Sequence, residues 1–110
     1  MEASYTYLFI RQDLCLEQQI IQTAHAIHMV GLNQEDRKLI PNAVLIGAKD
    51  SKELVDICQY LEYNRIPFEM FWEPDINEYT AIATHPLKGK IRNKLKHYKL
   101  LKYGKNEDHT

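Results

Sequence analysis

The stretch Tyr5-Thr6-Tyr7-Leu8-Phe9-Ile10-Arg11 decides the fold class of this chain of 110 residues. β-Branched and aromatic side chains fill it, as is typical of a well-buried strand. Residues 17 to about 30 follow without a proline or glycine, and Ile20, Ala24 and Ile27 recur in them at helical spacing. A buried strand followed directly by an amphipathic helix predicts an α/β fold with right-handed crossovers.

Helix-ending and helix-capping residues in the next part of the chain, with an apolar run between them, predict a second strand and a second helix. Gly31 is expected to end the first helix. The apolar run 43–47 is typical of a strand covered on both faces. Asp50 is a suitable cap for a helix with Glu53 three residues on. An apolar stripe then marks the buried face of this helix, and it consists of Leu54, Ile57, Cys58 and Leu61.

The last third of the chain completes the sheet. Residues 68–72 and 79–84 predict two strands joined by an acidic turn, and residues 87–98 predict a final helix with Leu87, Ile91, Leu95 and Tyr98 on one face. The expected order is therefore β-α-β-α-β-β-α. It corresponds to a single three-layer α/β domain, with a four-stranded mixed sheet and helices on both faces.

Length and composition predict one domain, residues 1–102, and a polar C-terminal tail, residues 103–110. Hydrophobic residues make up 45% and charged residues 26%, which argues against a disordered chain. No apolar run approaches the roughly 20 residues of a membrane span, and the first residues do not resemble a secretory signal. Cys15 and Cys58 suit neither a disulfide framework nor a zinc site, so reduced thiols and a cytoplasmic location are expected, with no metal and no cofactor.

The net charge of −1 hides an asymmetry. Residues 1–78 carry 6 basic and 13 acidic side chains, whereas residues 79–106 carry 8 basic side chains and no acidic one. A basic run of this kind can attract a polyanion, although a solvated helix face is the more common explanation for a charge run alone. The candidate nucleic-acid-binding residues in it are Lys88, Lys90, Arg92 and Lys94.

Ligands of open α/β sheets bind at the carboxyl ends of strands, and this rule selects a set of candidate site residues. They are Arg11 and Asp13 after the first strand, Gln18, Gln22 and His25 in the first helix, Trp72, Glu73 and Asp75 after the third strand, and Thr80 and Thr84 in the fourth strand.

Each charged candidate has a structural alternative. Glu73 or Asp75 could act as a general base on water if partly desolvated; the alternative is an acidic turn in solvent. Arg11 and Asp13 could bind a phosphate and orient a water, or could simply form a local ion pair. His25 could serve as a base, although a lone helical histidine is more often a packing residue.

Other signatures are weak or missing. Trp72 could stack on a nucleotide base, whereas the other aromatic residues at strand spacing are expected in the core. A His-x-x-His pair alone is insufficient for a metal site. The chain has no dinucleotide-binding or phosphate-binding glycine motif and no serine nucleophile elbow, which disfavours dinucleotide oxidoreductases, nucleoside triphosphatases and classical serine hydrolases.

Two segments near the start of the chain are Leu8-Phe9-Ile10-Arg11-Gln12-Asp13-Leu14 and Gln22-Thr23-Ala24-His25-Ala26. They resemble the opening strand and helix of the type II peptidyl-tRNA hydrolases. The resemblance continues through 50–54, 71–75 and 80–86, and covers about residues 5–87. It implies a divergent, phage- or bacteria-type member of the family, and hydrolysis of the ester between a peptide and the terminal ribose of tRNA.

In this interpretation Glu73, helped by Asp75 or His25, orients the attacking water, and Gln18, Gln22 and Thr80 position the ester. Arg11 and the basic C-terminal segment hold phosphates. The lysine-rich loop of the family is missing, because no lysine lies between Arg11 and Arg37.

Two other functions remain open at this point. The first is a non-catalytic module on the same fold that binds tRNA ends or sequesters a small signalling nucleotide. The second is a protein-interaction domain whose basic helix docks on an acidic partner. No membrane partner is expected, and a homodimer is compatible with so small a domain.

Overall fold

A computed structural model describes residues 2–102, so the predicted polar tail at residues 103–110 lies outside the described part of the chain. Seven elements follow one another in the predicted order. They are β1 (Tyr5–Arg11), α1 (Leu16–Asn33), β2 (Asn42–Ala48), α2 (Ser51–Tyr63), β3 (Phe68–Glu73), β4 (Glu78–Thr84) and the 3-10 helix η1 (Gly89–Leu95).

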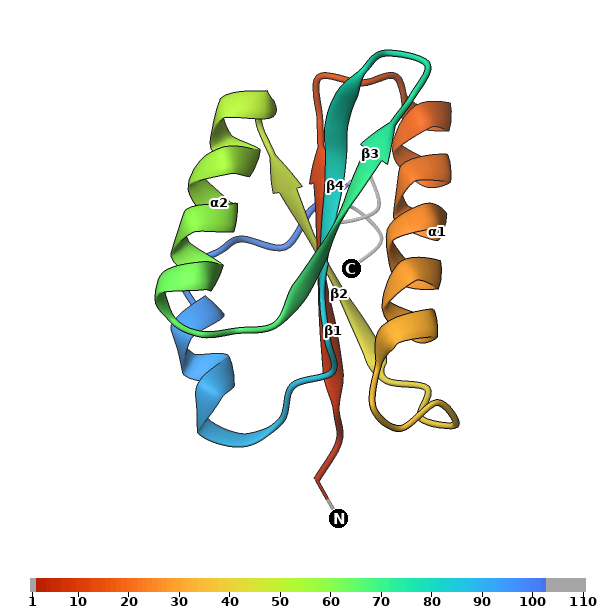
Figure 1. Cartoon of the computed structure of the whole chain (residues 1–110). Coiled ribbons are helices and arrows are strands. Elements are labelled where there is room, and N and C mark those ends of the chain that lie inside the picture. The colour runs from red at the N-terminus through yellow and green to blue at the C-terminus, as the bar shows by residue number, and fades with distance from the viewer. Residues whose placement is uncertain (1, 103–110) are drawn as a thin grey trace, which may run out of the picture.

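The four strands form one mixed sheet in the order β2-β1-β4-β3. β1 and β2 run parallel, with Leu8 opposite Leu45, and β4 runs antiparallel to both of its neighbours. Helix α1 covers one face of the sheet, and α2 and η1 lie on the other (Figure 1). The predicted three-layer α/β architecture with a mixed sheet is therefore confirmed.

Strand β1 lies inside the sheet, and its side chains alternate between two core clusters. Tyr7 and Phe9 belong to the cluster under α2, together with Ile82 of β4. Leu8 and Ile10 belong to the smaller cluster under α1. This double coverage explains why the opening stretch of sequence is apolar on both alternating faces.

The orientation of α1 differs from the prediction. Ile20, Ala24 and Ile27 mark an apolar stripe in the sequence, but this stripe faces solvent, and Ile20 is 62% exposed. The buried residues of the helix are Gln19, Gln22, Ala26 and Val30. The helix also continues past Gly31 to Asn33.

Hydrogen bonds explain this orientation. The side-chain amide of Gln19 donates to the carbonyl of Leu14 at 2.8 Å, and Gln22 bonds to side chains of β3 and β4. A buried amide is stable when its hydrogen bonds are satisfied, so the polar face of the first turns can pack on the sheet.

Helix α2 follows its predicted pattern. The carboxylate of Asp50 accepts a hydrogen bond from the backbone N–H of Glu53 at 2.9 Å, which satisfies one of the free donors at the helix start. Leu54, Ile57 and Leu61 are buried, and Cys58 packs against their cluster as a free thiol.

The C-terminal segment differs from the predicted regular helix over 87–98. The predicted apolar positions do pack on the α2-side core, but only the seven residues of η1 are helical. Beyond them the chain extends along β2, where the N–H of Leu101 donates to the carbonyl of Leu45 at 2.8 Å. This pairing covers part of the outer edge of β2, and it requires extended backbone that a longer helix would not supply.

Strand β2 is an edge strand of the sheet, and its two faces are not both covered along its length as predicted. Ile46 and Ala48 are buried, whereas Ala43 is exposed.

Within residues 2–102, no helix has the length and apolar content needed to cross a membrane.

Candidate functional site

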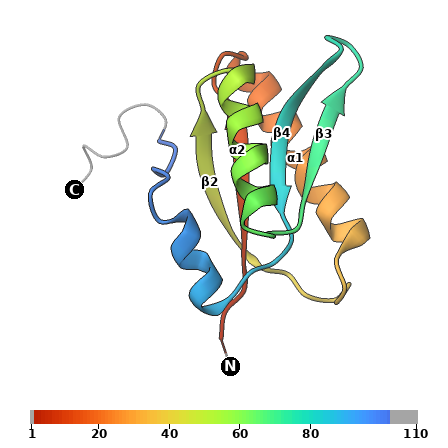
Figure 2. The same cartoon turned by 60° about the vertical axis from the view of Figure 1, so that its left-hand side comes forward.

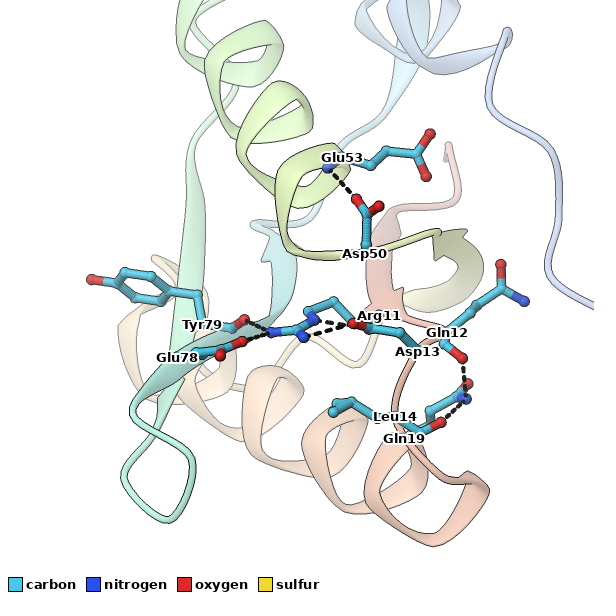
Figure 3. Close-up of polar contacts among 9 residues, drawn as sticks. All are labelled: Arg11, Gln12, Asp13, Leu14, Gln19, Asp50, Glu53, Glu78 and Tyr79. Carbon is cyan, nitrogen blue, oxygen red and sulfur yellow. Dashed lines mark hydrogen bonds and ion pairs between the residues drawn. The ribbon is translucent and has the colours of Figure 1, made fainter.

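Arg11 ends β1, and its guanidinium group is held by two acidic residues (Figure 3). The group donates to both carboxylate oxygens of Asp13, at 2.9 and 2.8 Å. It also forms an ion pair with Glu78 and donates to the carbonyl of Tyr79 at 3.1 Å. The hydrogen bonds from Arg11 lower the pKa of Asp13. The structure thus contains the local ion pair that the sequence left open, and two carboxylates already balance the charge of Arg11.

A β-bulge shapes the neighbouring part of the same sheet edge. The pairing of β3 with β4 shifts register, so that Phe71 lies opposite Ala81 but Trp72 lies opposite Tyr79. Thr80 is the extra residue on β4, and a bulge commonly redirects a side chain. The hydroxyl of Thr80, which is fully buried, donates to the side-chain oxygen of Gln22 at 2.9 Å.

Gln22 also forms a hydrogen bond with Glu73. Its buried amide nitrogen donates to a carboxylate oxygen of Glu73 at 2.7 Å and to the side-chain oxygen of Gln18 at 3.1 Å. Thr80, Gln22 and Glu73 therefore form a chain of hydrogen bonds from β4 through α1 to the end of β3. We call these three residues the Glu73 relay.

The carboxylate of Glu73 is kept ionised by its surroundings. The hydrogen bond from Gln22, the backbone N–H of Asp75 at 3.2 Å and the nearby His25 lower the pKa of Glu73. Each carboxylate oxygen accepts one of these two hydrogen bonds and retains capacity for another donor. A partly buried, oriented carboxylate of this kind can accept a hydrogen bond from a water molecule.

His25 lies on the helix one turn beyond Gln22. Its ring stacks on Phe71, with the ring centres 4.5 Å apart and the planes at 12°. Since Phe71 and Glu73 alternate with Trp72 along β3, they face the same side of the sheet, toward α1. The exposed imidazole of His25 therefore lies on the same side of the sheet as the relay carboxylate.

The structure separates the remaining candidates from this group. Trp72 points to the other side of β3 and packs edge-on against Tyr79, with the ring centres 4.9 Å apart. Asp75 contributes its backbone N–H, and its side chain is exposed. Thr84 lies at the far end of β4, where its hydroxyl accepts from the N–H of Tyr7 at 3.0 Å.

The basic residues lie at the opposite end of the sheet. Because β4 is antiparallel to β1, its carboxyl end meets the start of β1, where Tyr5 and Leu87 form a backbone bridge. Figure 1 shows η1 near this end, away from the β3–β4 hairpin. The predicted nucleic-acid-binding set, Lys88, Lys90, Arg92 and Lys94, is therefore on a different part of the molecule from Glu73.

Sequence reasoning missed the partners of Arg92. Its guanidinium lies 3.5 Å from the centre of the Tyr5 ring, and its Nε donates to the hydroxyl of Tyr7 at 2.8 Å. The spacing of two tyrosines at alternate positions of β1 was the available signal, because it places both rings on one face. Among residues 2–102, no group of three or more histidine, cysteine, aspartate or glutamate side chains is arranged to hold a metal ion.

Comparisons with known proteins bear on the fold. No family model and no curated protein matches this chain. A solved structure of a protein of unknown function from Agrobacterium tumefaciens is similar, with a TM-score of 0.63 and 17% identity over 93% of this chain and 100% of that one. At this level of identity the likeness establishes a shared fold.

Proposed function

We propose that this protein hydrolyses the ester at the end of a peptidyl-tRNA, the reaction of the family that its sequence resembles. The observation that carries the proposal is the Glu73 relay. It holds an ionised carboxylate at the sheet edge where α/β proteins bind ligands, beside an imidazole.

The proposed reaction needs an oriented water. The water donates a hydrogen bond to Glu73 and attacks the ester carbonyl, while His25 or Glu73 accepts the proton. The ester bond then breaks, the peptide leaves as an acid, and the terminal ribose regains its hydroxyl. The side-chain oxygen of Gln18 accepts from Gln22, and in this proposal its amide nitrogen donates to the developing negative charge on the carbonyl oxygen.

Charge restricts how the tRNA would approach. The end of the sheet that holds the Glu73 relay, called the relay edge below, carries several carboxylates. The charge of Arg11 is already balanced there by Asp13 and Glu78. Phosphate contacts are therefore assigned to the basic η1 region, which has no acidic residue. Since a tRNA is larger than this domain, it can contact η1 while its terminal ester lies at the other end of the sheet.

A turnover assay tests the proposal. Purified protein is mixed with a peptidyl-tRNA mimic, and release of free tRNA is followed for the wild type, Glu73→Gln and Glu62→Gln. Glu62 is exposed on α2 and provides a control for the loss of one carboxylate. We expect release by the wild type and the control, and a loss of at least about 100-fold in Glu73→Gln. Equal release by both variants would remove Glu73 from the mechanism.

One observation favours the non-catalytic module as a second candidate. Residues 12–36 contain no lysine, so the lysine-rich loop is missing, and within residues 2–102 the arginine at this end of the sheet, Arg11, is paired with two carboxylates. A protein that is folded, binds tRNA or a nucleotide stoichiometrically and releases no tRNA would fit this second function.

A further inference from the structure

A cleft lies between β2 and the C-terminal segment, on the α2 side of the sheet. Figure 2 shows this segment running from η1 alongside β2. The cleft has a volume of about 480 Å³, which is within the usual range for small-molecule sites. Val44, Ile46 and Leu95 give it an apolar floor, and Tyr98 adds an aromatic side.

Arg92 is the fixed polar group of this cleft. The Tyr5 ring and the Tyr7 hydroxyl hold its guanidinium in place. No carboxylate of residues 2–102 forms an ion pair with it, whereas Arg11 has two such partners. A partly buried arginine that is oriented but has no counter-ion is a preorganised donor for an anion, and phosphate geometry suits its planar fork.

The surroundings of Arg92 strengthen the preference for an anion. Lys96 and Asn93 also line the cleft, and no acidic residue does. An adjoining cavity of about 440 Å³ shares Ile46, Tyr98 and Leu100 with the cleft, and it adds Lys99 and Lys102 together with one carboxylate, Glu53. Several cations around one hollow raise the local concentration of anionic ligands.

We propose that this cleft binds a nucleoside monophosphate, with the phosphate on Arg92, Asn93 and Lys96 and the base against the apolar floor and Tyr98. An apolar floor beside an unpaired guanidinium favours a ligand with both a planar ring and a phosphate. Inorganic phosphate would leave the floor unused, and a nucleoside would leave Arg92 unpaired. This site is separate from the Glu73 relay and does not depend on the proposed hydrolysis.

Binding of adenosine monophosphate, adenosine and inorganic phosphate to the whole protein tests the proposal, by calorimetry and by shifts of backbone amide resonances. We expect the monophosphate to bind more tightly than either fragment and to shift amides of β2 and residues 89–100. Binding of inorganic phosphate as tight as that of the monophosphate would contradict the proposal, as would shifts confined to the relay edge.

Charge variants then locate the phosphate. Lys96→Gln should weaken binding by about threefold and Arg92→Gln by about tenfold or more, whereas Lys38→Gln, an exposed control in the loop before β2, should bind like the wild type. Since Arg92 also contacts two tyrosines, Lys96→Gln keeps the test valid if Arg92→Gln fails to fold. Equal loss in Lys96→Gln and Lys38→Gln would overturn the proposal, because only general charge would then matter. The proposal is also overturned if tRNA binds but the monophosphate does not.

Discussion

Replacing Thr80 with valine removes one hydroxyl from the Glu73 relay while preserving the shape of the side chain. The hydroxyl donates to the buried side-chain oxygen of Gln22 at 2.9 Å, and both residues have no exposed surface. The variant leaves that oxygen without its donor, and a buried acceptor in this state costs about 1–3 kcal/mol. We therefore expect Thr80→Val to lower the free energy of unfolding by this amount.

Thr6 provides a matched control, because it is equally buried but its hydroxyl has no hydrogen-bond partner within the described residues. Thr6→Val should leave stability unchanged or raise it, since valine removes an unsatisfied polar atom. The assay is urea unfolding, in which the free energy of unfolding falls by about 1–3 kcal/mol per molar urea. With the same slope for both variants, the midpoint of Thr80→Val should lie clearly below that of Thr6→Val. Equal midpoints for Thr80→Val and Thr6→Val would refute the relay as a stabilising network.

Three further predictions concern charge and packing. Arg11 lowers the pKa of Asp13, so this pair contributes stability above the ordinary pKa of aspartate, and the contribution disappears as the pH falls through the lowered value. In Arg11→Met, protonation of Asp13 should no longer cause this loss of stability, which thermal unfolding between about pH 2 and 6 would detect. A pH profile equal to that of the wild type would exclude the ion pair. Ile20→Gln should change stability by less than about 0.5 kcal/mol, whereas Ala26→Gln should be clearly destabilising, because Ile20 is exposed and Ala26 is buried; the reverse result in urea unfolding would mean that α1 is rotated. Neutralising the basic residues of η1 together, namely Lys90, Arg92 and Lys94, should flatten the salt dependence of tRNA binding. The slope of log K against log salt concentration should fall by about one for each phosphate that the protein no longer neutralises. An unchanged slope would exclude this surface as the tRNA contact.

Strands β1, β3 and β4 and helix α2 could be predicted from the sequence because local pattern and tertiary packing agree there. Tyr5–Arg11 was predicted with its observed bounds, since its side chains are apolar on both faces and both faces are buried. Asp50 caps α2 as its type and position indicate. In these segments the hydrophobic spacing alone identifies the buried side.

The orientation of α1 could not be predicted in this way. Its apolar spacing indicates the wrong face, because Gln19 and Gln22 are buried through hydrogen bonds to groups outside the helix. The partners of Gln22 on β3 and β4 are far from it in the sequence. The extended segment after η1 was missed for a similar reason. Its position depends on backbone pairing with β2, which the side-chain pattern of residues 96–101 does not reveal.

Part of the candidate site followed from topology. The rule about carboxyl strand ends selected Gln22, Glu73 and Thr80, and the structure joins them by hydrogen bonds. The same rule also selected Thr84, which lies at the other end of β4, because the direction of that strand reverses its contribution. The bulge that redirects Thr80 depends on the register between β3 and β4, which was not visible in the sequence.

In the proposed reaction the Glu73 relay orients a water for ester hydrolysis. Single-turnover release of tRNA from a peptidyl-tRNA mimic tests this role, with wild type and Glu73→Gln compared at equal folded concentration. We predict rapid release by the wild type and almost none by the variant. Equal rates, or no release by folded wild type, would exclude this role for Glu73.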